Sequence, residues 1–230
     1  MKTNQDYKNA ALNALRGNWA PAILAMVVFT LIEIVFLSPS LYYQFTLQDT
    51  ISSLDPSDMA GMMDVYRKIM GASSLTSLAS VFLLYPLLIG FTNTFRYLFV
   101  KGDNRLTENM FSITFKRYWH NVWGYLLMYI FIALWSLLFI IPGIVKVFSY
   151  AMTPYILEEN PELSANDAID RSRAMMKGHK FDLFYLYLSF IGWGILCIFT
   201  LGIGFFWLGP YMYTSTAAFY EDIKSEYNGF

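Results

Sequence analysis

Long apolar stretches alternate with short polar ones along this chain, and their lengths predict membrane-spanning helices. A helix that crosses the hydrocarbon core of a bilayer, about 30 Å thick, needs roughly 20 mostly apolar residues. Four stretches meet this requirement, namely 19–37, 74–100, 123–141 and 183–201. Two weaker stretches, 143–157 and 203–220, each follow a Gly or Pro turn directly after a clear span. Each of these two is expected to be a return helix, a re-entrant segment or an interfacial one.

The positions of lysine and arginine decide between these possibilities. Cytoplasmic loops of membrane proteins collect Lys and Arg. The N-terminus and the segments 101–122 and 158–182 carry three, four and four Lys and Arg residues, whereas 38–72 carries two. Both late basic segments can lie inside only if 143–157 returns across the membrane. The pattern therefore predicts an all-α integral membrane protein, a single domain over 1–230, with about six transmembrane helices and both ends cytoplasmic. Four spans with two partial hairpins remain the alternative.

The segments between the spans have helical patterns of their own. Amphipathic interfacial helices are predicted over 3–16, 107–119 and 164–177. In the last of these, Ser164 is a good N-cap and Asp167 resembles the second half of a capping box. One narrow face of this helix carries Ala165, Ala168, Ile169, Ser172 and Met176. The external loop 38–72 is expected to hold a helix near 57–70, whose methionines lie on the bilayer or on the spans rather than bind a metal.

Composition supports a membrane location and excludes several classes of protein. Hydrophobic residues make up 56% of the chain and charged residues 14%, whereas soluble domains carry about 25% charged residues. The net charge of -1 gives no bulk attraction to nucleic acid. Cys197 is the only cysteine, so no disulfide framework is possible within one chain. The first 18 residues are polar and the first apolar run is long, which argues against a cleavable signal peptide.

No pattern in the chain indicates an enzyme, and we expect no catalytic residue, metal or cofactor. Gly-rich phosphate loops, nucleophile elbows and metalloprotease helices are missing from the sequence. The two histidines, His120 and His179, lack a second metal-type ligand at helical spacing. A lipid-modifying enzyme would need acids or histidines clustered near one membrane face, and only Glu158, Glu159, Asp170 and His179 could contribute them.

The polar and helix-breaking residues inside the spans are the first candidates for function, because charges within a membrane are expensive. Glu33 is the only acid deep in a span, and it could bind a proton or cation or simply reach headgroup water. Lys146 is expected on the external side, where it could extend to the headgroups. Pro142, Gly143 and Pro154 break helices, and broken helices free backbone carbonyls that transporters use for binding. Tight turns and close packing explain such breaks equally well.

A second group of candidates lies on the expected cytoplasmic surface. The stretch 160–180 and the adjoining turn-linked hairpin 142–155 are dense in polar, Gly and Pro residues. The candidates there are Tyr150, Asn160, Arg171, Arg173, Lys177, His179 and Lys180. Our first hypothesis is a non-enzymatic module that binds membrane lipids or a partner protein, including a second copy of the chain, through this face. The alternative is a small transporter or channel that uses Glu33 and the broken helices.

Several of these stretches together resemble a known bacterial family. The carrying motifs are Ala14-Leu-Arg-Gly-Asn-Trp19, Trp135-Ser-Leu-Leu-Phe-Ile-Ile-Pro-Gly-Ile-Val-Lys146, Thr153-Pro-Tyr155, Glu159-Asn-Pro-Glu-Leu-Ser164, Met176-Lys-Gly-His-Lys180 and Thr200-Leu-Gly-Ile-Gly204. They are similar to the integral membrane family called domain of unknown function 975. The likeness covers nearly the whole chain except the external loop. It implies a multi-pass protein of the bacterial cytoplasmic membrane, and it implies no activity.

Overall fold

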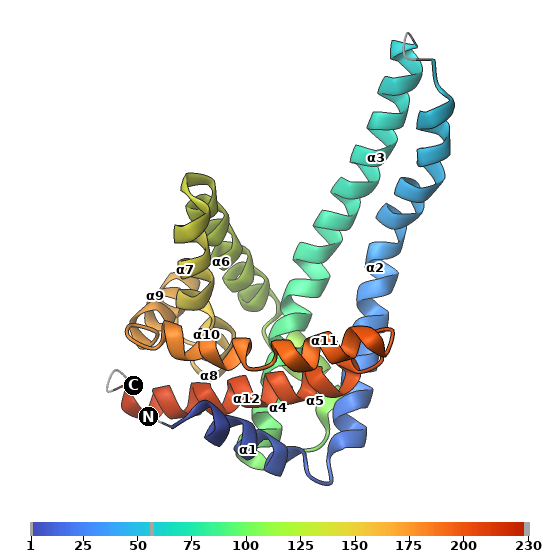
Figure 1. The fold of residues 1–230 in the computed structure, drawn as a ribbon. Helices are drawn as coiled ribbons and strands as arrows, with labels where there is room; N and C mark the ends of the chain where they lie inside the picture. Colours follow the sequence, from blue (N-terminus) through green and yellow to red (C-terminus); the bar gives the residue numbers. More distant parts are fainter. Residues whose placement is uncertain (1, 56–57, 228–230) are drawn as a thin grey trace.

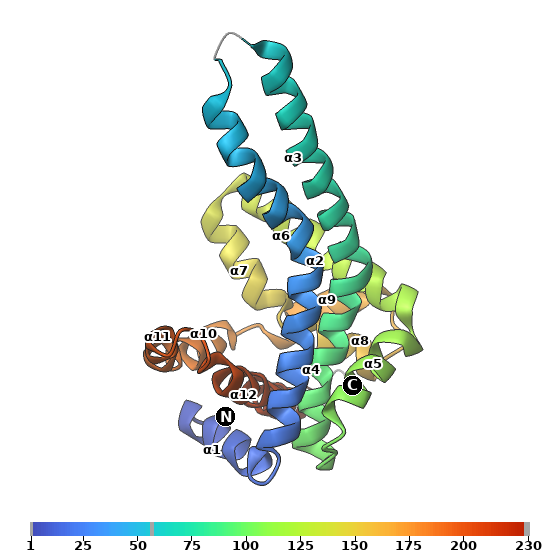
Figure 2. The ribbon, with the colours of Figure 1, turned by 90° about the vertical axis from the view of Figure 1, so that its right-hand side faces the viewer.

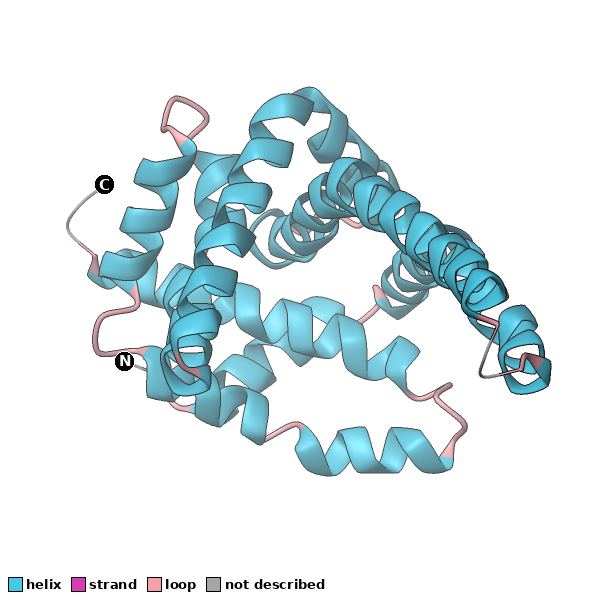
Figure 3. Cartoon of the chain, turned by 90° about the horizontal axis from the view of Figure 1, so that it is seen from above, coloured by secondary structure: helices cyan, strands magenta, loops and turns pink. Residues whose placement is uncertain are grey.

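The computed structural model describes residues 2–55 and 58–227, and the regular elements within those ranges are helices joined by short loops (Figures 1 and 3). The predicted all-α class is confirmed. In chain order the elements are α1 (Asn4–Leu15), α2 (Trp19–Ser53), α3 (Met59–Ala79), the π-helical segment η1 (Ser80–Leu84), α4 (Tyr85–Lys101), α5 (Leu106–Lys116), α6 (Tyr118–Leu138), α7 (Ile140–Tyr150), α8 (Thr153–Glu159), α9 (Ala165–Met175), α10 (Lys180–Leu188), α11 (Ile191–Phe199) and α12 (Phe205–Glu226).

Two helical hairpins stand on a base of helices that run in another direction. The hairpins α2–α3 and α6–α7 point to the same side, and α10, α11 and α12 lie crosswise beneath them (Figures 1 and 2). Helix α1 packs along α12 in the base. The backbone N–H of Lys2 donates to the carboxylate of Asp222 at 3.3 Å. Both ends of the described chain therefore lie on one side of the molecule.

Local sequence sets the ends of the two amphipathic helices in the base. Thr3 caps α1, because its hydroxyl accepts from the N–H of Asp6 while the Asp6 carboxylate accepts from the N–H of Thr3 at 2.8 Å. Ser164 caps α9 in the same position, accepting from the N–H of Asp167 at 3.2 Å. The face predicted for this helix is buried in full, as Ala165, Ala168, Ile169, Ser172 and Met176 show. Both predicted helix starts are confirmed to within one residue.

The loop predicted over 38–72 is helical over its first part, 38–53, whereas the helix expected near 57–70 is confirmed. Helix α2 continues through this region to Ser53, and α3 begins at Met59. The two helices pack against each other, and Leu47 and Val65 are buried in the hairpin. In this pairing the apolar side chains of an otherwise polar segment pack against the neighbouring helix. The chain therefore stays helical beyond the expected span.

Five segments among the described residues are long and apolar enough to cross a membrane. They are Trp19–Phe36, Met59–Lys101, Tyr118–Leu138, Ile140–Glu159 and Lys180–Phe199. The sixth expected span, 203–220, forms α12 and is not among them. Its middle, Thr214–Tyr220, is buried in the base and begins with three hydroxyl residues. The segment expected over 183–201 breaks into α10 and α11.

Helix α4 is the centre around which the base is packed. It contacts α1, α2, α5, α6, α8 and α12, and most of its residues from Pro86 to Arg96 are buried. Phe91 stacks on Phe29 of α2 with 4.2 Å between ring centres. At Gly90 a Cβ atom would lie 2.1 Å from the backbone carbonyl oxygen of Met110. Glycine at this position therefore lets α5 approach α4 closely.

Candidate functional site

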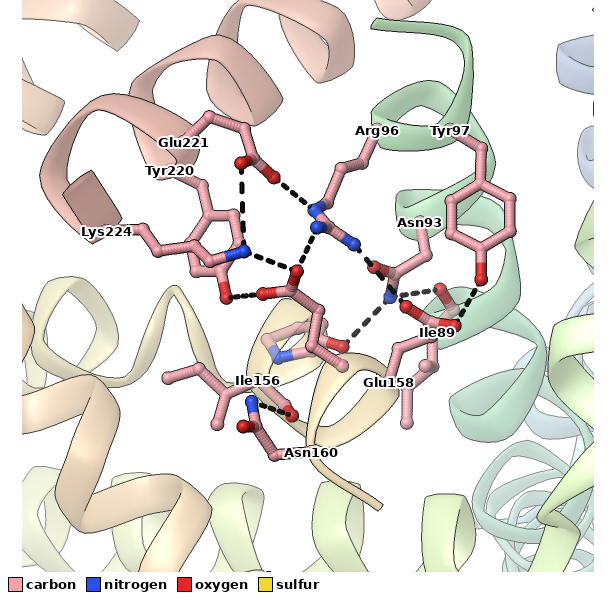
Figure 4. A network of polar contacts seen from close by, with 12 residues as sticks. Ile89, Asn93, Arg96, Tyr97, Ile156, Glu158, Asn160, Tyr220, Glu221 and Lys224 are labelled. Atoms are coloured by element: carbon pink, nitrogen blue, oxygen red, sulfur yellow. Dashed lines mark hydrogen bonds and ion pairs between the residues drawn. The ribbon is translucent and has the colours of Figure 1, made fainter. Parts of the chain in front are cut away.

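A buried set of ion pairs joins α4, α8 and α12 (Figure 4). Arg96 of α4 lies at its centre and is 6% exposed. Its guanidinium donates to Glu159, to Glu221 at 2.5 Å and to Glu158 at 3.4 Å. Lys224 adds a contact of 2.5 Å to Glu159. We call these five residues the ion-pair network; it ties three helices that are distant in sequence.

Two tyrosines complete the hydrogen bonding of the network. Tyr97 donates to Glu158, and Tyr220 donates to Glu159 at 2.5 Å. Burial, followed by the nearby Glu159 carboxylate, raises the pKa of Tyr220, so its phenol stays protonated and remains a donor. With its three carboxylates and two cations ionised, the network carries one net negative charge. The charge of Arg96 is thus more than compensated by its own partners.

A chain of amide contacts extends the network along α8. The side chain of Asn93 donates to the backbone carbonyl of Pro154 at 2.9 Å. At the other end of α8, the side-chain amide oxygen of Asn160 accepts a hydrogen bond from the guanidinium of Arg171 of α9 at 3.2 Å. Three residues singled out from the sequence, Pro154, Asn160 and Arg171, therefore border the network and help to fix α8 between α4 and α9.

A cavity of about 640 Å³ lies between the two hairpins and the base. Seven helices contribute to its walls, and no charged side chain of the described residues lines it. Six tyrosines do line it, namely Tyr125, Tyr129, Tyr150, Tyr155, Tyr187 and Tyr213. We call it the tyrosine cavity. Its walls combine apolar surface with phenol groups, which suits a ligand that is apolar along most of its length.

Tyr155 separates the tyrosine cavity from the ion-pair network. One face of its ring stacks on Tyr220 with 4.7 Å between ring centres, while the residue also lines the cavity. Tyr155 is 1% exposed, and its hydroxyl has no hydrogen-bond partner among the described residues. Buried polar groups are nearly always paired in native proteins. This hydroxyl is therefore a free hydrogen-bonding position at the cavity wall.

Glu33, the acid singled out within the first span, lies on the cavity side of α2. It follows Met26 and Phe29 at helical spacing; Met26 lines the cavity and Phe29 is buried against α4. Glu33 is half-buried and makes no ion pair among the residues that the structure describes. Its charge acts on Tyr213 of the cavity wall: burial, then Tyr187 and then Glu33 raise the pKa of the Tyr213 phenol.

Lys146, which the sequence predicts to reach the headgroups, has aromatic neighbours in the structure. Its ammonium lies 4.3 Å from the centre of a Trp135 ring and 5.6 Å from that of Tyr150. Helix α7 is short and packs against α9 and α10. The charges of Arg173 and Lys180 are therefore close enough to act on Lys146. Lys146 therefore lies between Trp135 of α6 and the basic residues of α9 and α10, and its position relative to the membrane stays a prediction.

The remaining candidates have packing or surface positions. Gly143 allows α7 to approach α6, since a Cβ there would lie 2.9 Å from the Ser136 Cα. Pro142 lies in the first turn of α7. Lys177 is exposed after the end of α9. His179 lies 3.5 Å from Asp182 and 3.9 Å from Glu226. In the described chain no group of three His, Cys, Asp or Glu side chains could hold a metal ion.

The sequence interpretation missed the residues that form the ion-pair network. Arg96, Glu221 and Lys224 were not among the candidates, and the acid pair Glu158 and Glu159 was named only as a possible contributor to an enzyme site. The sequence did contain a usable signal. Arg96 lies inside an apolar run, one helical turn after Asn93, and two consecutive acids, Glu158 and Glu159, end a different apolar run. A cation in such a run needs an acidic partner, but sequence spacing does not say which acid supplies it.

The fold and the exposed apolar helices place this chain in a recognisable class. It is an all-helical protein with five segments of the length and composition of membrane spans. The chain belongs to the family described as "Protein of unknown function (DUF975)", which matches residues 1–151 and 142–227. The resemblance found in its motifs is thus confirmed. Comparison with curated proteins and with solved structures gives no match.

Proposed function

We propose that this is a non-enzymatic protein of the bacterial cytoplasmic membrane that binds a lipid-like amphiphile in the tyrosine cavity. The cavity is the observation that carries the proposal. Its volume of about 640 Å³ falls within the range of roughly 300–1,000 Å³ that is typical of small-molecule sites. Such sites are mostly apolar with a few placed polar groups, and the cavity has apolar walls with phenol hydroxyls.

Exposed apolar turns support a membrane setting. In the turn between α6 and α7, Leu137 is 86% exposed and Ile140 is 77% exposed. In the turn between α11 and α12, Leu201 is 94% exposed. Contiguous exposed apolar surface of this kind marks a membrane or a partner. Its occurrence at two separate turns, one at the tip of the α6–α7 hairpin and one in the base, favours lipid, which contacts outward surfaces over its whole thickness.

Tryptophans support an interfacial position for the crosswise helices. Trp19, Trp193 and Trp207 line a second cleft of about 420 Å³ between α1, α2, α11 and α12. Tryptophan is enriched at membrane–water interfaces. We infer that the base lies at the cytoplasmic interface, with both ends of the chain inside and with α10–α12 partly embedded rather than spanning.

The basic surface of α9 and α10 extends this proposal to the membrane surface or to a partner protein. Arg173, Lys177 and Lys180 lie there, with Lys146 nearby. Anionic headgroups attract such clusters by about 1 kcal/mol per basic residue. Reversing the charges of Arg171, Arg173 and Lys180 together is expected to weaken binding to anionic vesicles or to a co-purifying protein. Unchanged binding in both assays would remove this part of the proposal.

Transport is a second candidate function, favoured by Glu33 on the cavity side of α2. A transporter would move its substrate through the cavity, whereas a binding module would only retain it. Proteoliposomes loaded with the retained amphiphile distinguish the two. Movement between leaflets or across the membrane that is lost in Glu33→Gln would indicate transport.

Retention of lipid tests the proposed binding function. We expect native mass spectrometry of the protein in mild detergent to show a bound amphiphile. Ala151→Trp fills the cavity from the end of α7 and is expected to abolish retention; Met212→Trp does the same from α12. Ala133→Trp is the matched control, because Ala133 is exposed on the outer side of α6. Retention that is equal in all three folded variants would overturn the proposal.

A further inference from the structure

We propose that the amphiphile in the tyrosine cavity carries an ammonium group, which lies among the tyrosine rings with Glu33 as its counter-ion. This inference rests on the proposed binding function and names the chemical class of the ligand. The ligand is an apolar chain that ends in a protonated amine. Two sources carry such an amine, a free long-chain amine and an ethanolamine phospholipid, and the phosphate of the phospholipid would have to lie outside the cavity because the lining offers it no cation.

The charges around the cavity favour a cation. Glu33 lies outside the lining, seven residues after Met26 on the same face of α2, and has no ion-pair partner among the described residues. Below Tyr155 lies the ion-pair network, whose ionised groups sum to one negative charge. The cations near the cavity, Lys146, Arg173 and Arg96, lie outside the lining; Arg173 pairs with Asp170 at 3.1 Å, and Arg96 is paired within the ion-pair network. The lining thus offers a buried anion no cation, whereas a buried cation meets phenol oxygens and ring faces there and has Glu33 further along the same face of α2.

The tyrosine rings supply the second part of the site. Tyr129 stacks on Tyr85 with 4.6 Å between ring centres, and Tyr125 lies 5.8 Å from Tyr129. Tyr213 of α12 lines the same cavity as Tyr125 and Tyr129. Aromatic faces attract ammonium groups, and several rings around one space form the cages that recognise them.

The hydroxyl of Tyr155 completes the match with an ammonium rather than with a quaternary nitrogen. It is buried at the cavity wall without a partner among the described residues. A primary ammonium has three N–H donors, so one of them can bond the phenol oxygen while the others point towards Glu33 or a second phenol. A trimethylated nitrogen has no N–H to offer.

A matched series of twelve-carbon amphiphiles tests the charge preference directly. The protein is placed in phosphatidylglycerol nanodiscs, which contain no ammonium lipid, and exposed to dodecylamine, dodecanol or dodecanoate at equal membrane concentration. Native mass spectrometry measures occupancy. We expect dodecylamine to bind about tenfold more tightly than dodecanol, which corresponds to about 1.4 kcal/mol. Dodecanoate is expected to bind least.

Two substitutions test the residues. Glu33→Gln keeps the shape and removes the charge, so the preference for the amine over the alcohol should fall to about unity while dodecanol binds as before. Tyr155→Phe should weaken amine binding several-fold without loss of thermal stability, since its hydroxyl bonds no described residue. Glu108→Gln, an exposed acid on α5, is the control and should change neither ratio.

The outcomes separate the two proposals. Equal binding of amine and alcohol, or tighter binding of dodecanoate, would overturn the ammonium inference and leave lipid binding intact. Failure of every member of the series to bind would overturn both. If ethanolamine phospholipid displaces dodecylamine, the lipid is the natural source; if it does not, a free amine is, and either result supports the inference.

Discussion

Replacing Arg96 by methionine is expected to destabilise the protein strongly. Methionine fills a similar volume but removes the guanidinium that contacts Glu158, Glu159 and Glu221. Three carboxylates would then face one another with Lys224 as the remaining cation of the network. Removing one partner of a buried ion pair costs about 3–5 kcal/mol, because the other charge stays buried without compensation. The side chains of the three acids keep 16–23% exposure, so we expect a value near the lower end of that range, about 3 kcal/mol.

Thermal unfolding in one detergent, followed by the loss of monodisperse protein, measures this effect. Arg105→Met is the matched control, because the Arg105 side chain is 63% exposed although it also pairs with acids. Exposed pairs contribute about 1 kcal/mol or less. Adding Glu159→Gln to Arg96→Met should recover part of the loss, since it removes one of the unpaired charges. If Arg96→Met unfolds at the same temperature as Arg105→Met, the network is not a stabilising junction.

Two further predictions concern packing and pH. Gly90→Ala should destabilise by about 1–3 kcal/mol, because the new methyl group meets the Met110 carbonyl; Gly71→Ala, with open space around it, should be neutral or stabilising in the same unfolding assay. Asp222 accepts from Tyr7 at 2.7 Å, and although burial opposes this, the hydrogen bonds lower its pKa. Wild type should therefore exceed Asp222→Asn in stability above the unfolded pKa of about 3.9, and the difference should vanish as pH falls through the lower folded pKa. A pH-independent difference would show that the Asp222 charge does not contribute.

Features that depend on neighbouring residues were predictable from the sequence. The start of α9 and its buried face follow from one capping residue and a helical period, both of which lie within a few turns. The first helix was predictable for the same reason. The length of α2 was not predictable from the sequence. The apolar positions near Leu47 stabilise the helix only when α3 packs against them, and no local pattern indicates that the two segments pair.

The ion-pair network lay beyond sequence reasoning for a different reason. Arg96 bonds Glu159 and Glu221, which are 63 and 125 residues away along the chain. Charge patterning indicates that a cation in an apolar run needs an acid, but it does not say that α12 lies crosswise and delivers one. The approach of Lys146 to Trp135 and to the charges of α9 and α10 likewise depends on how the helices pack.

The length of the α2–α3 hairpin has a consequence outside the bilayer. Helix α2 has 35 residues, which extend about 52 Å at 1.5 Å per residue, whereas a hydrocarbon core is about 30 Å thick. In the proposed orientation the apolar part of α2 begins at the cytoplasmic interface, so its outer turns and those of α3 stand as a rigid stalk beyond the opposite surface. The protein thereby extends its reach to molecules in the adjoining aqueous layer that never contact the lipid.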